Sequence, residues 1–331
     1  MKIPNKCKYI EIQKFGAPEV LSIKIKKVPE INDNEILIKV KASGVNRPDV
    51  LQRQGKYLPP KNASNIPGLE VSGIIVKLGK NVKCLKLNQK VCALTHGGGY
   101  AEYCKVYWKH VLPIPKNINF IEAAAIPETF FTVWYNLFDL GKLKKKETIL
   151  IHGGSSGIGT TAIQLARLKD CKTIVTVGSQ EKAKACKKLG ADIVINYKKS
   201  DFFNEIKNIQ SFKGIDVILD MVGKNYFKKN LSLLNDKGRL ILIAFLTGSK
   251  TDFDLKDIII KRLHITGSTL RPRSNKEKSR IARNVFKSFW TELSKKSIKP
   301  IIYKTFELKN ANKAHKLMES SKHIGKIVLT N

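Results

Sequence analysis

Small residues gather in one short stretch of the chain, between an apolar run and a helical pattern. The segment from Thr148 to Ile151 is β-branched and apolar, as in a buried strand, and His152 to Gly159 is rich in glycine and serine. Apolar residues then recur at helical spacing from Ile158 to Ala166. A strand, a glycine-rich turn and a helix in this order can bind a dinucleotide, because the glycines and the helix N-terminus let backbone N–H groups reach a pyrophosphate.

The glycine pattern alone leaves a second interpretation open. It is looser than G-x-G-x-x-G, since Gly153 and Gly154 are adjacent and Ser155-Ser156 follows them. A glycine-rich turn without a ligand would look the same. Either serine can also cap the helix.

Alternating strands and helices surround this stretch. Apolar strand patterns recur at 173–177, 193–195, 216–220, 239–244 and 264–266, and a helix is predicted from Gln180 to Leu189. Such βαβ alternation predicts an α/β domain with a doubly wound parallel sheet of five or six strands. We place this domain at residues 126–268.

The rest of the chain lacks this alternation of strands and helices. Residues 1–125 contain short strands such as Glu35 to Ala42, separated by glycine and proline turns, and the first of them falls within Met1 to Gly16. This pattern of short strands and turns predicts a barrel-like β domain. Residues 269–331 add a basic segment, an amphipathic helix and two strands, 301–306 and 326–329, whose partners we expect in the N-terminal β domain.

Charge is the unusual feature of the composition. The 331 residues include 61 Lys and Arg against 27 Asp and Glu, for a formal net charge of +34. A nucleic-acid or membrane surface, an anionic small ligand, and a general lysine-rich drift all remain open. The basic residues are scattered without a basic stripe or interleaved aromatics, which favours the drift over a nucleic-acid partner.

The cysteines and the hydropathy pattern bear on the compartment. Six well-separated cysteines contain no C-x-x-C pair, which is typical of free thiols in a reducing compartment. No apolar run is long enough for a membrane span, and the N-terminus lacks the apolar core of a signal peptide. We therefore expect a cytoplasmic protein.

Several motifs resemble a known family. They are Gly44 to Asp49, Gln52 to Tyr57, Pro67 to Glu70, Gly97 to Tyr103, Ala123 to Glu128, Gly190 to Asp192, Ala314 to Glu319 and Ile324 to Leu329. Together they resemble the quinone oxidoreductases of the medium-chain dehydrogenase/reductase superfamily, and are closest to the p53-inducible quinone oxidoreductase subgroup. The resemblance covers nearly the whole chain. It implies a GroES-like β-barrel domain, a Rossmann domain with a six-stranded parallel sheet, and a nicotinamide cofactor.

The end of the second strand of the sheet bears on the choice of cofactor. An acidic residue there binds the ribose hydroxyls in NAD enzymes, but this chain has Gly178-Ser179. A hydroxyl and an ammonium would attract a 2′-phosphate, so Ser179 and Lys182 predict NADPH. Both could instead be a helix cap and a solvated lysine. The resemblance places Tyr197 near the adenine or its phosphate; it could equally be a half-buried strand tyrosine.

The resemblance also implies residues for the rest of the cofactor. Asn46 and Asp49 match positions on the nicotinamide side, and Tyr57 is a candidate hydrogen-bond donor to a developing oxyanion or, alternatively, a residue that shapes the cofactor channel. The further cofactor-binding positions are Thr132, Ser155, Ser156, Gly157, Ile158, Phe245, Leu270 and Lys326. His152 is expected to be structural.

Ligands for a catalytic metal are missing from the matching positions. Zinc-dependent relatives have Cys where this chain has Asn46 and His-Glu where it has Leu69-Glu70, and no Cys or His occurs between Asn117 and Trp134. We therefore expect no metal site. Without a Lewis acid, electron-poor acceptors are favoured over alcohols.

These observations predict an NADPH-dependent quinone oxidoreductase that transfers a hydride without a metal. A 2-alkenal or enone reductase shares every motif and stays open as an alternative. An RNA-binding protein of the same fold and a scaffold with a vestigial site are further alternatives. We expect a homodimer that pairs through a sheet edge, formed by the strand Arg239 to Ala244 and the residues after it.

Overall fold

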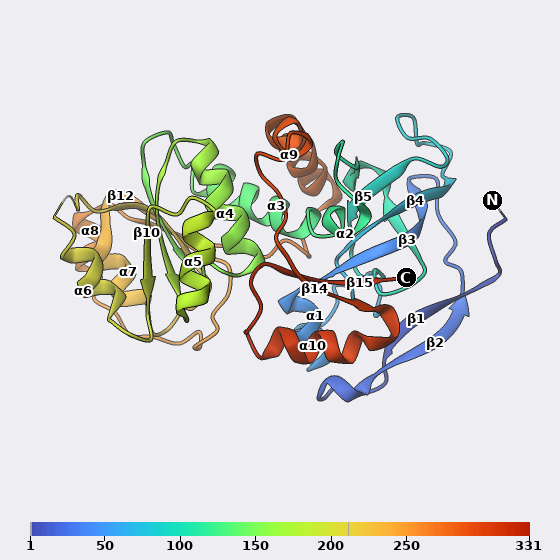
Figure 1. The fold of residues 1–331 in the computed structure, drawn as a ribbon, viewed down its shortest axis with the longest axis horizontal. Coiled ribbons are helices and arrows are strands. Elements are labelled where there is room, and N and C mark those ends of the chain that lie inside the picture. The colour runs from blue at the N-terminus through green and yellow to red at the C-terminus, as the bar shows by residue number, and fades with distance from the viewer. Residues whose placement is uncertain (1, 211) are drawn as a thin grey trace. The chain divides into compact units, whose positions relative to one another are not determined.

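The computed structural model describes residues 2–210 and 212–331; Met1 of the predicted N-terminal segment lies outside them. The chain forms two compact units (Figure 1). The first consists of residues 1–131 and 270–331, and the second of residues 132–269. The second unit is therefore continuous in sequence, whereas the first is assembled from both ends of the chain. In the described residues, no helix has the length and apolarity needed to cross a membrane.

The first unit is built on antiparallel strands. Its strands are β1 (Lys6–Ile12), β2 (Leu21–Lys27), β3 (Glu35–Val45), β4 (Glu70–Leu78), β5 (Lys90–Leu94), β6 (Tyr103–Tyr107), β7 (Val111–Pro113), β14 (Ile302–Glu307) and β15 (Lys326–Thr330). β1 pairs with β2, and the order of the larger sheet is β14-β15-β3-β4-β5-β7, with β6 also on β3. The GroES-like β fold is confirmed.

β3 organises the larger sheet. Its first half, Glu35 to Lys39, pairs with β6, and its second half, Ala42 to Val45, pairs with β15 from the far end of the chain. β4 runs along the other edge of β3. Most β3 side chains are buried, as expected for a strand covered on both faces. The predicted pairing of the C-terminal strands with the N-terminal domain is confirmed.

Helices complete the first unit. They are α1 (Arg47–Arg53), α2 (Phe120–Ala123), α3 (Pro127–Val133, which crosses the unit boundary), α9 (Asn275–Ser294) and α10 (Ala311–Glu319), with short 3-10 turns η1 (Pro18–Val20), η2 (Trp108–His110) and η4 (Leu308–Asn310). α9 is the predicted amphipathic helix, capped by Ser274. An ion pair joins the buried Arg53 of α1 to the partly exposed Glu319 of α10, with 2.6 Å between nitrogen and oxygen.

The second unit contains a parallel six-stranded sheet. Its strands are β8 (Thr148–His152), β9 (Lys172–Val177), β10 (Ile193–Asn196), β11 (Ile215–Asp220), β12 (Leu234–Leu242) and β13 (His264–Gly267), in the order β10-β9-β8-β11-β12-β13. The predicted Rossmann sheet is therefore confirmed. The point where the strand order reverses lies between β8 and β11, the usual ligand end of such a sheet.

Helices cover both faces of this sheet (Figure 1). α4 (Gly157–Leu168) and α5 (Gln180–Lys188) pack on one face, and α6 (Phe202–Lys207), α7 (Phe227–Leu233) and α8 (Lys256–Ile260) lie on the other. A π-helical segment, η3 (Trp134–Leu140), opens the unit. Aliphatic and aromatic side chains of the strands, α6 and α7 form a common core.

One detail of the sheet corrects the sequence-based prediction. The strand Arg239 to Ala244, together with the residues after it, was expected at the sheet edge, but β12 lies between β11 and β13. The edge strand on this side is β13, which contains the predicted strand 264–266.

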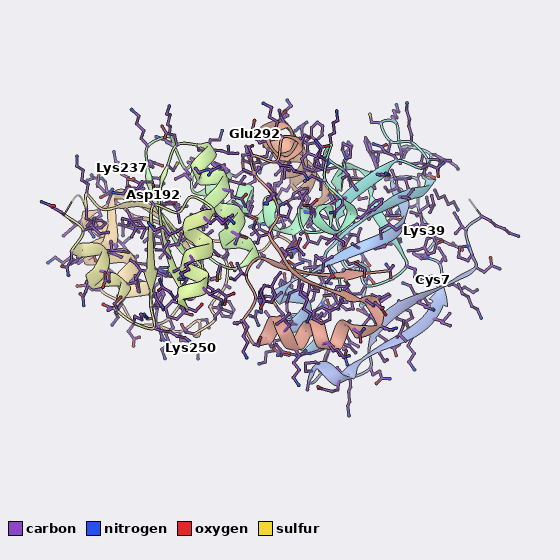
Figure 2. All side chains as sticks on the ribbon, viewed as in Figure 1. Cys7, Lys39, Asp192, Lys237, Lys250 and Glu292 are labelled. Carbon is purple, nitrogen blue, oxygen red and sulfur yellow. The ribbon has the colours of Figure 1, made fainter. Side chains whose placement is uncertain are left out.

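The basic residues are spread over the surface. Side chains with nitrogen tips project around the outline of both units; the exposed Lys237 lies in β12, and the exposed Lys250 lies in the loop after that strand (Figure 2). This distribution fits solvated lysines better than one docking surface.

Candidate functional site

The turn between β8 and α4 has no room for side chains at two positions. Gly153 has φ +72°, a left-handed conformation that favours glycine. A Cβ on Gly159 would lie 2.3 Å from the carbonyl oxygen of Gly153. The two glycines therefore let the turn approach the first turn of α4 closely.

The start of α4 is suited to bind an anion. Ser156 is the N-cap residue, and its Oγ accepts a hydrogen bond from the N–H of Gly159 over 2.9 Å. Ser155 is nearly buried. In the described part of the chain, the N–H groups of Gly157 and Ile158 have no hydrogen-bond acceptor. Free N–H groups and the partial positive charge of the helix end can hold a pyrophosphate, so these residues fit a dinucleotide.

A buried polar network lies beneath the turn. His152 at the end of β8 bonds through Nδ1 to Thr176 Oγ1 (3.0 Å) and through Nε2 to Asn230 Oδ1 (2.8 Å). Asn230 Nδ2 donates to Asp220 at the end of β11. Burial lowers the pKa of His152 to about 4, so the imidazole is neutral. The network ties strand ends together, in keeping with a structural His152.

The tip of β9 presents a hydroxyl and cations. Ser179 caps α5 by accepting the N–H of Lys182 over 3.2 Å. Lys182 is half-buried, and its pKa is lowered first by burial and then by the positive charge of Lys198. The two predicted residues, Ser179 and Lys182, thus lie together at one strand tip. Lys198 was missed, because its only signal is its place two residues after a strand.

Tyr197 lies at the same end of the sheet. It is 46% exposed, and its hydroxyl would be 2.6 Å from a Cβ on Gly178. Glycine is therefore required where the ring passes over the strand tip. Two other predicted residues of this unit, the half-buried Thr132 and the exposed Phe245, make no side-chain contact with this group that the structure records. Their roles stay predictions.

The first unit contains a group of polar side chains that we call the polar cluster: Asn46, Asp49, Glu70, Glu128 and Lys326. At its centre, Lys326 Nζ lies 2.7 Å from Glu70 Oε1, with side chains 5% and 0% exposed. The ammonium also donates to Asn46 Oδ1 (2.5 Å) and to the carbonyl of Val45 (3.0 Å). Asn46 Nδ2 donates to Glu70 Oε1. Lys326, predicted near the cofactor phosphates, is therefore engaged by three oxygen atoms within its own unit.

Asp49 supports the loops around this centre. It is fully buried and accepts the N–H groups of Asn46 (2.9 Å) and Gly68 (2.8 Å). The Tyr100 hydroxyl lies 3.4 Å away. Burial raises the pKa of Asp49 to about 6, although the two backbone hydrogen bonds oppose the shift. This carboxyl group thus fixes the backbone that carries Asn46.

Glu128 at the start of α3 completes the polar cluster. Its N–H donates to Glu70 Oε2 over 2.9 Å, and its own side chain is half-buried. Burial, and then the negative charge of Glu70, raises the pKa of Glu128 to about 8. Glu128 was not predicted as a site residue, although it ends the Ala123 to Glu128 motif.

Tyr57 lies beside a buried arginine. The guanidinium carbon of Arg271 is 5.9 Å from the Tyr57 ring centre, and Arg271 Nη1 donates to Gln52 Oε1 over 2.8 Å. Burial and the charge of Glu128 raise the pKa of Tyr57, so the phenol is protonated and can donate a hydrogen bond. Leu270, which precedes Arg271, is 8% exposed. Arg271 was missed because nothing distinguishes it within its basic segment.

Metal-binding side chains are not grouped in the described residues: no cluster of three or more His, Cys, Asp or Glu could hold an ion. Instead, a cation of the protein, Lys326, lies between Glu70 and Asn46.

Comparisons with known proteins agree with both units. Residues 32–116 match the alcohol dehydrogenase GroES-like domain, and residues 157–285 match the zinc-binding dehydrogenase family model. The chain is 32% identical to a quinone oxidoreductase of Rattus norvegicus over 97% of its own length and 96% of the relative. The chain belongs to the quinone oxidoreductase family of medium-chain dehydrogenases and reductases.

Solved structures support this quinone oxidoreductase family assignment. The Escherichia coli quinone oxidoreductase complexed with NADPH has a TM-score of 0.87 and 30% identity, with 98% of this chain and all of that chain covered. The human synaptic vesicle membrane protein VAT-1 homolog-like protein has a TM-score of 0.86 and 27% identity, with 99% of each chain covered. The chain is therefore an oxidoreductase of this family.

The ion pair at the centre of the polar cluster predicts that removing the cation alone destabilises the protein more than removing both charges. Lys326→Met leaves the carboxylate of Glu70 buried without its cation, and we expect the free energy of unfolding to fall by about 3–5 kcal/mol. Adding Glu70→Gln removes that charge and retains an acceptor for either Asn46 Nδ2 or the N–H of Glu128, though not for both, so the double variant should regain part of the loss. Urea denaturation measures both. A double variant no more stable than Lys326→Met would contradict this account.

Proposed function

We propose that this protein is an NADPH-dependent quinone oxidoreductase that works without a metal ion. The observation that carries the proposal is the 32% identity to a quinone oxidoreductase over 97% of the chain. A dinucleotide turn with free N–H groups on α4 supports it from the second unit. NADPH accompanies the similar Escherichia coli enzyme.

Each unit supplies a separate part of the proposed chemistry. The nicotinamide, when bound, supplies the hydride. Gly157 and Ile158 bind the pyrophosphate through their N–H groups, with Ser155 and Ser156 beside them. In the first unit, Tyr57 donates a hydrogen bond to the acceptor oxygen as negative charge develops there. Asn46, held at both ends by Lys326 and Glu70, lines the nicotinamide side.

The metal-free character of the proposal rests on Lys326. Its ammonium is within hydrogen-bond distance of Glu70, Asn46 and the Val45 carbonyl, the oxygen atoms that a cation would use. A metal ion there would face a positive charge 4% exposed to solvent. Acceptors that take a hydride without a Lewis acid, quinones above all, suit such a site.

Steady-state kinetics test the reaction. With NADPH, we expect turnover of an ortho-quinone such as 9,10-phenanthrenequinone, unaffected by a metal chelator, because the acceptor is already electron-poor. An alkenal, assayed in parallel, tests the enone reductase alternative. Preference for the alkenal would replace the quinone assignment, and NADPH oxidation with neither acceptor would refute the proposed reaction.

Cofactor selectivity is predicted to depend on the tip of β9. We propose that Ser179, Lys182 and Lys198 hold the 2′-phosphate, with Tyr197 beside the adenine. Lys182→Ala and Lys198→Ala should each weaken NADPH binding roughly tenfold and leave NADH binding unchanged, because each removes a charged partner of the phosphate. Ser179→Asp should reverse the preference by repulsion. Isothermal titration calorimetry measures all three.

Lys184→Ala provides the matched control for these variants, since Lys184 is exposed on the same helix. Wild-type protein that binds NADH and NADPH with equal affinity would contradict the selectivity.

We also propose that two copies pair through β13. Its outer edge lacks a neighbouring strand in the described structure, and Ile260 of the adjacent α8 is 60% exposed. We expect a dimer in sedimentation at micromolar concentration, and a shift toward monomer in Ile260→Asp. Ile25→Asp, on β2 and similarly exposed at 64%, is the matched control. Monomeric wild-type protein would refute the pairing.

A reducing compartment, as in the cytoplasm, fits the thiols. All six cysteines are free, and five of them are buried.

A further inference from the structure

Glu128 is a half-buried residue inside the polar cluster. Its backbone N–H is fixed on Glu70 Oε2, so the first turn of α3 is anchored against β4. Its side chain is half-buried, and no residue that the structure describes hydrogen-bonds to its carboxyl group. The other acids of the polar cluster differ: Glu70 and Asp49 are fully buried and accept several hydrogen bonds each.

The surrounding charges favour the protonated form of this carboxyl group. Glu70 and Asp49 oppose its ionisation, while Lys326 and Lys278 favour it. The ammonium of Lys326, however, is bonded directly to Glu70. With burial as the largest cause, the pKa of Glu128 rises to about 8. At pH 7 roughly 90% of such groups carry a proton, and they can still release it.

Two neighbouring groups are less available than Glu128 to give a proton to a bound molecule. Burial raises the pKa of Tyr57 above its usual value, so its phenol can donate a hydrogen bond but parts with its proton reluctantly. Lys278 is fully buried and donates to His96 Nε2 (2.9 Å) and to the carbonyl of Arg271 (2.5 Å). Burial lowers the pKa of Lys278 to about 8, but two of its three protons are directed at these protein acceptors.

We propose that Glu128 is the proton donor of the reaction: its carboxyl group protonates the acceptor after hydride transfer. This inference rests on the proposed function, and it assigns the proton half of the reduction to a residue of the first unit. A carboxylic acid held near the working pH is well matched to this role.

The acceptor gains a hydride from the reduced nicotinamide, which is thereby oxidised, and becomes an oxyanion. The O–H bond of Glu128 breaks and an O–H bond forms on that oxygen, giving the neutral hydroquinone or enol. A proton from the solvent then restores the carboxyl group. Tyr57 stabilises the oxyanion by a hydrogen bond and keeps its own proton.

The kinetic test compares Glu128→Gln with wild type, with NADPH and 9,10-phenanthrenequinone across pH 6–10. We expect kcat to fall about 100-fold in Glu128→Gln, with unchanged NADPH affinity. Wild-type kcat should decline above about pH 8, where the carboxyl group has lost its proton, and this decline should be absent in the variant. Glu128→Asp should retain it. Glu30→Gln, the same change at an exposed position, should behave as wild type.

A second readout needs no turnover. Because the folded protein holds the Glu128 proton more tightly than the unfolded chain, the resulting stability is complete below the ordinary pKa near 4.5 and is lost as the pH rises through about 8. The melting temperature of Glu128→Gln should therefore exceed that of wild type increasingly from pH 5 to pH 9. Glu30→Gln should show no such trend.

The outcomes separate the two proposals. Wild-type kcat and an intact alkaline decline in Glu128→Gln would overturn the assignment of Glu128 while leaving the reductase intact. A loss of NADPH affinity that accounts for the lower activity would overturn it too, because Glu128 would then act in binding. Wild-type protein that reduces neither quinone nor alkenal would refute the proposed function, and with it the proton donor.

Discussion

The first unit depends on one buried ion pair, between Lys326 and Glu70. It joins β15, from the C-terminal segment, to β4 and to the loop after β3, and it fixes the amide of Asn46 from both sides. A buried pair of this kind contributes little net stability unless its remaining hydrogen-bonding groups are satisfied, and here they are. The same pair leaves Glu70 as the negative neighbour of Glu128. One interaction thus connects chain topology, side-chain orientation and the protonation of a partly exposed acid.

The second unit stabilises its ligand end in a different way. Its strands end in a buried hydrogen-bond network around the neutral His152, with Thr176, Asn230 and the carboxyl group of Asp220. Backbone N–H groups without acceptors lie at the start of α4. The cations Lys182 and Lys198 lie at the neighbouring strand tip. Charge is therefore placed where it can discriminate between nucleotides.

The sequence was sufficient for elements whose signal is local. Apolar β-branched runs located the strands of the parallel sheet, and small residues located the turn before α4. The polar cluster was only partly predictable, because its partners are distant in the chain: Lys326 meets Asn46 across 280 residues, and Glu128 meets Glu70 across 58. Asn46, Asp49 and Lys326 came from motifs, but motifs carry no information on burial. Glu128, Arg271 and Lys198 acquire their properties from neighbours that only the folded chain supplies.

The path of the chain through β3 also has a consequence for biosynthesis. β3 pairs with β15 along the second half of one edge, and the last residue of β15 is Thr330, whereas the parallel sheet is complete once residue 267 has been made. A nascent chain leaves the ribosome from its N-terminus, and continuous domains fold as units as they emerge. The nucleotide unit can therefore fold while the segment before it still lacks its closing strands. That earlier segment, with the hydrogen-bonding edge of β3 uncovered, is where we expect chaperones to be needed until translation ends.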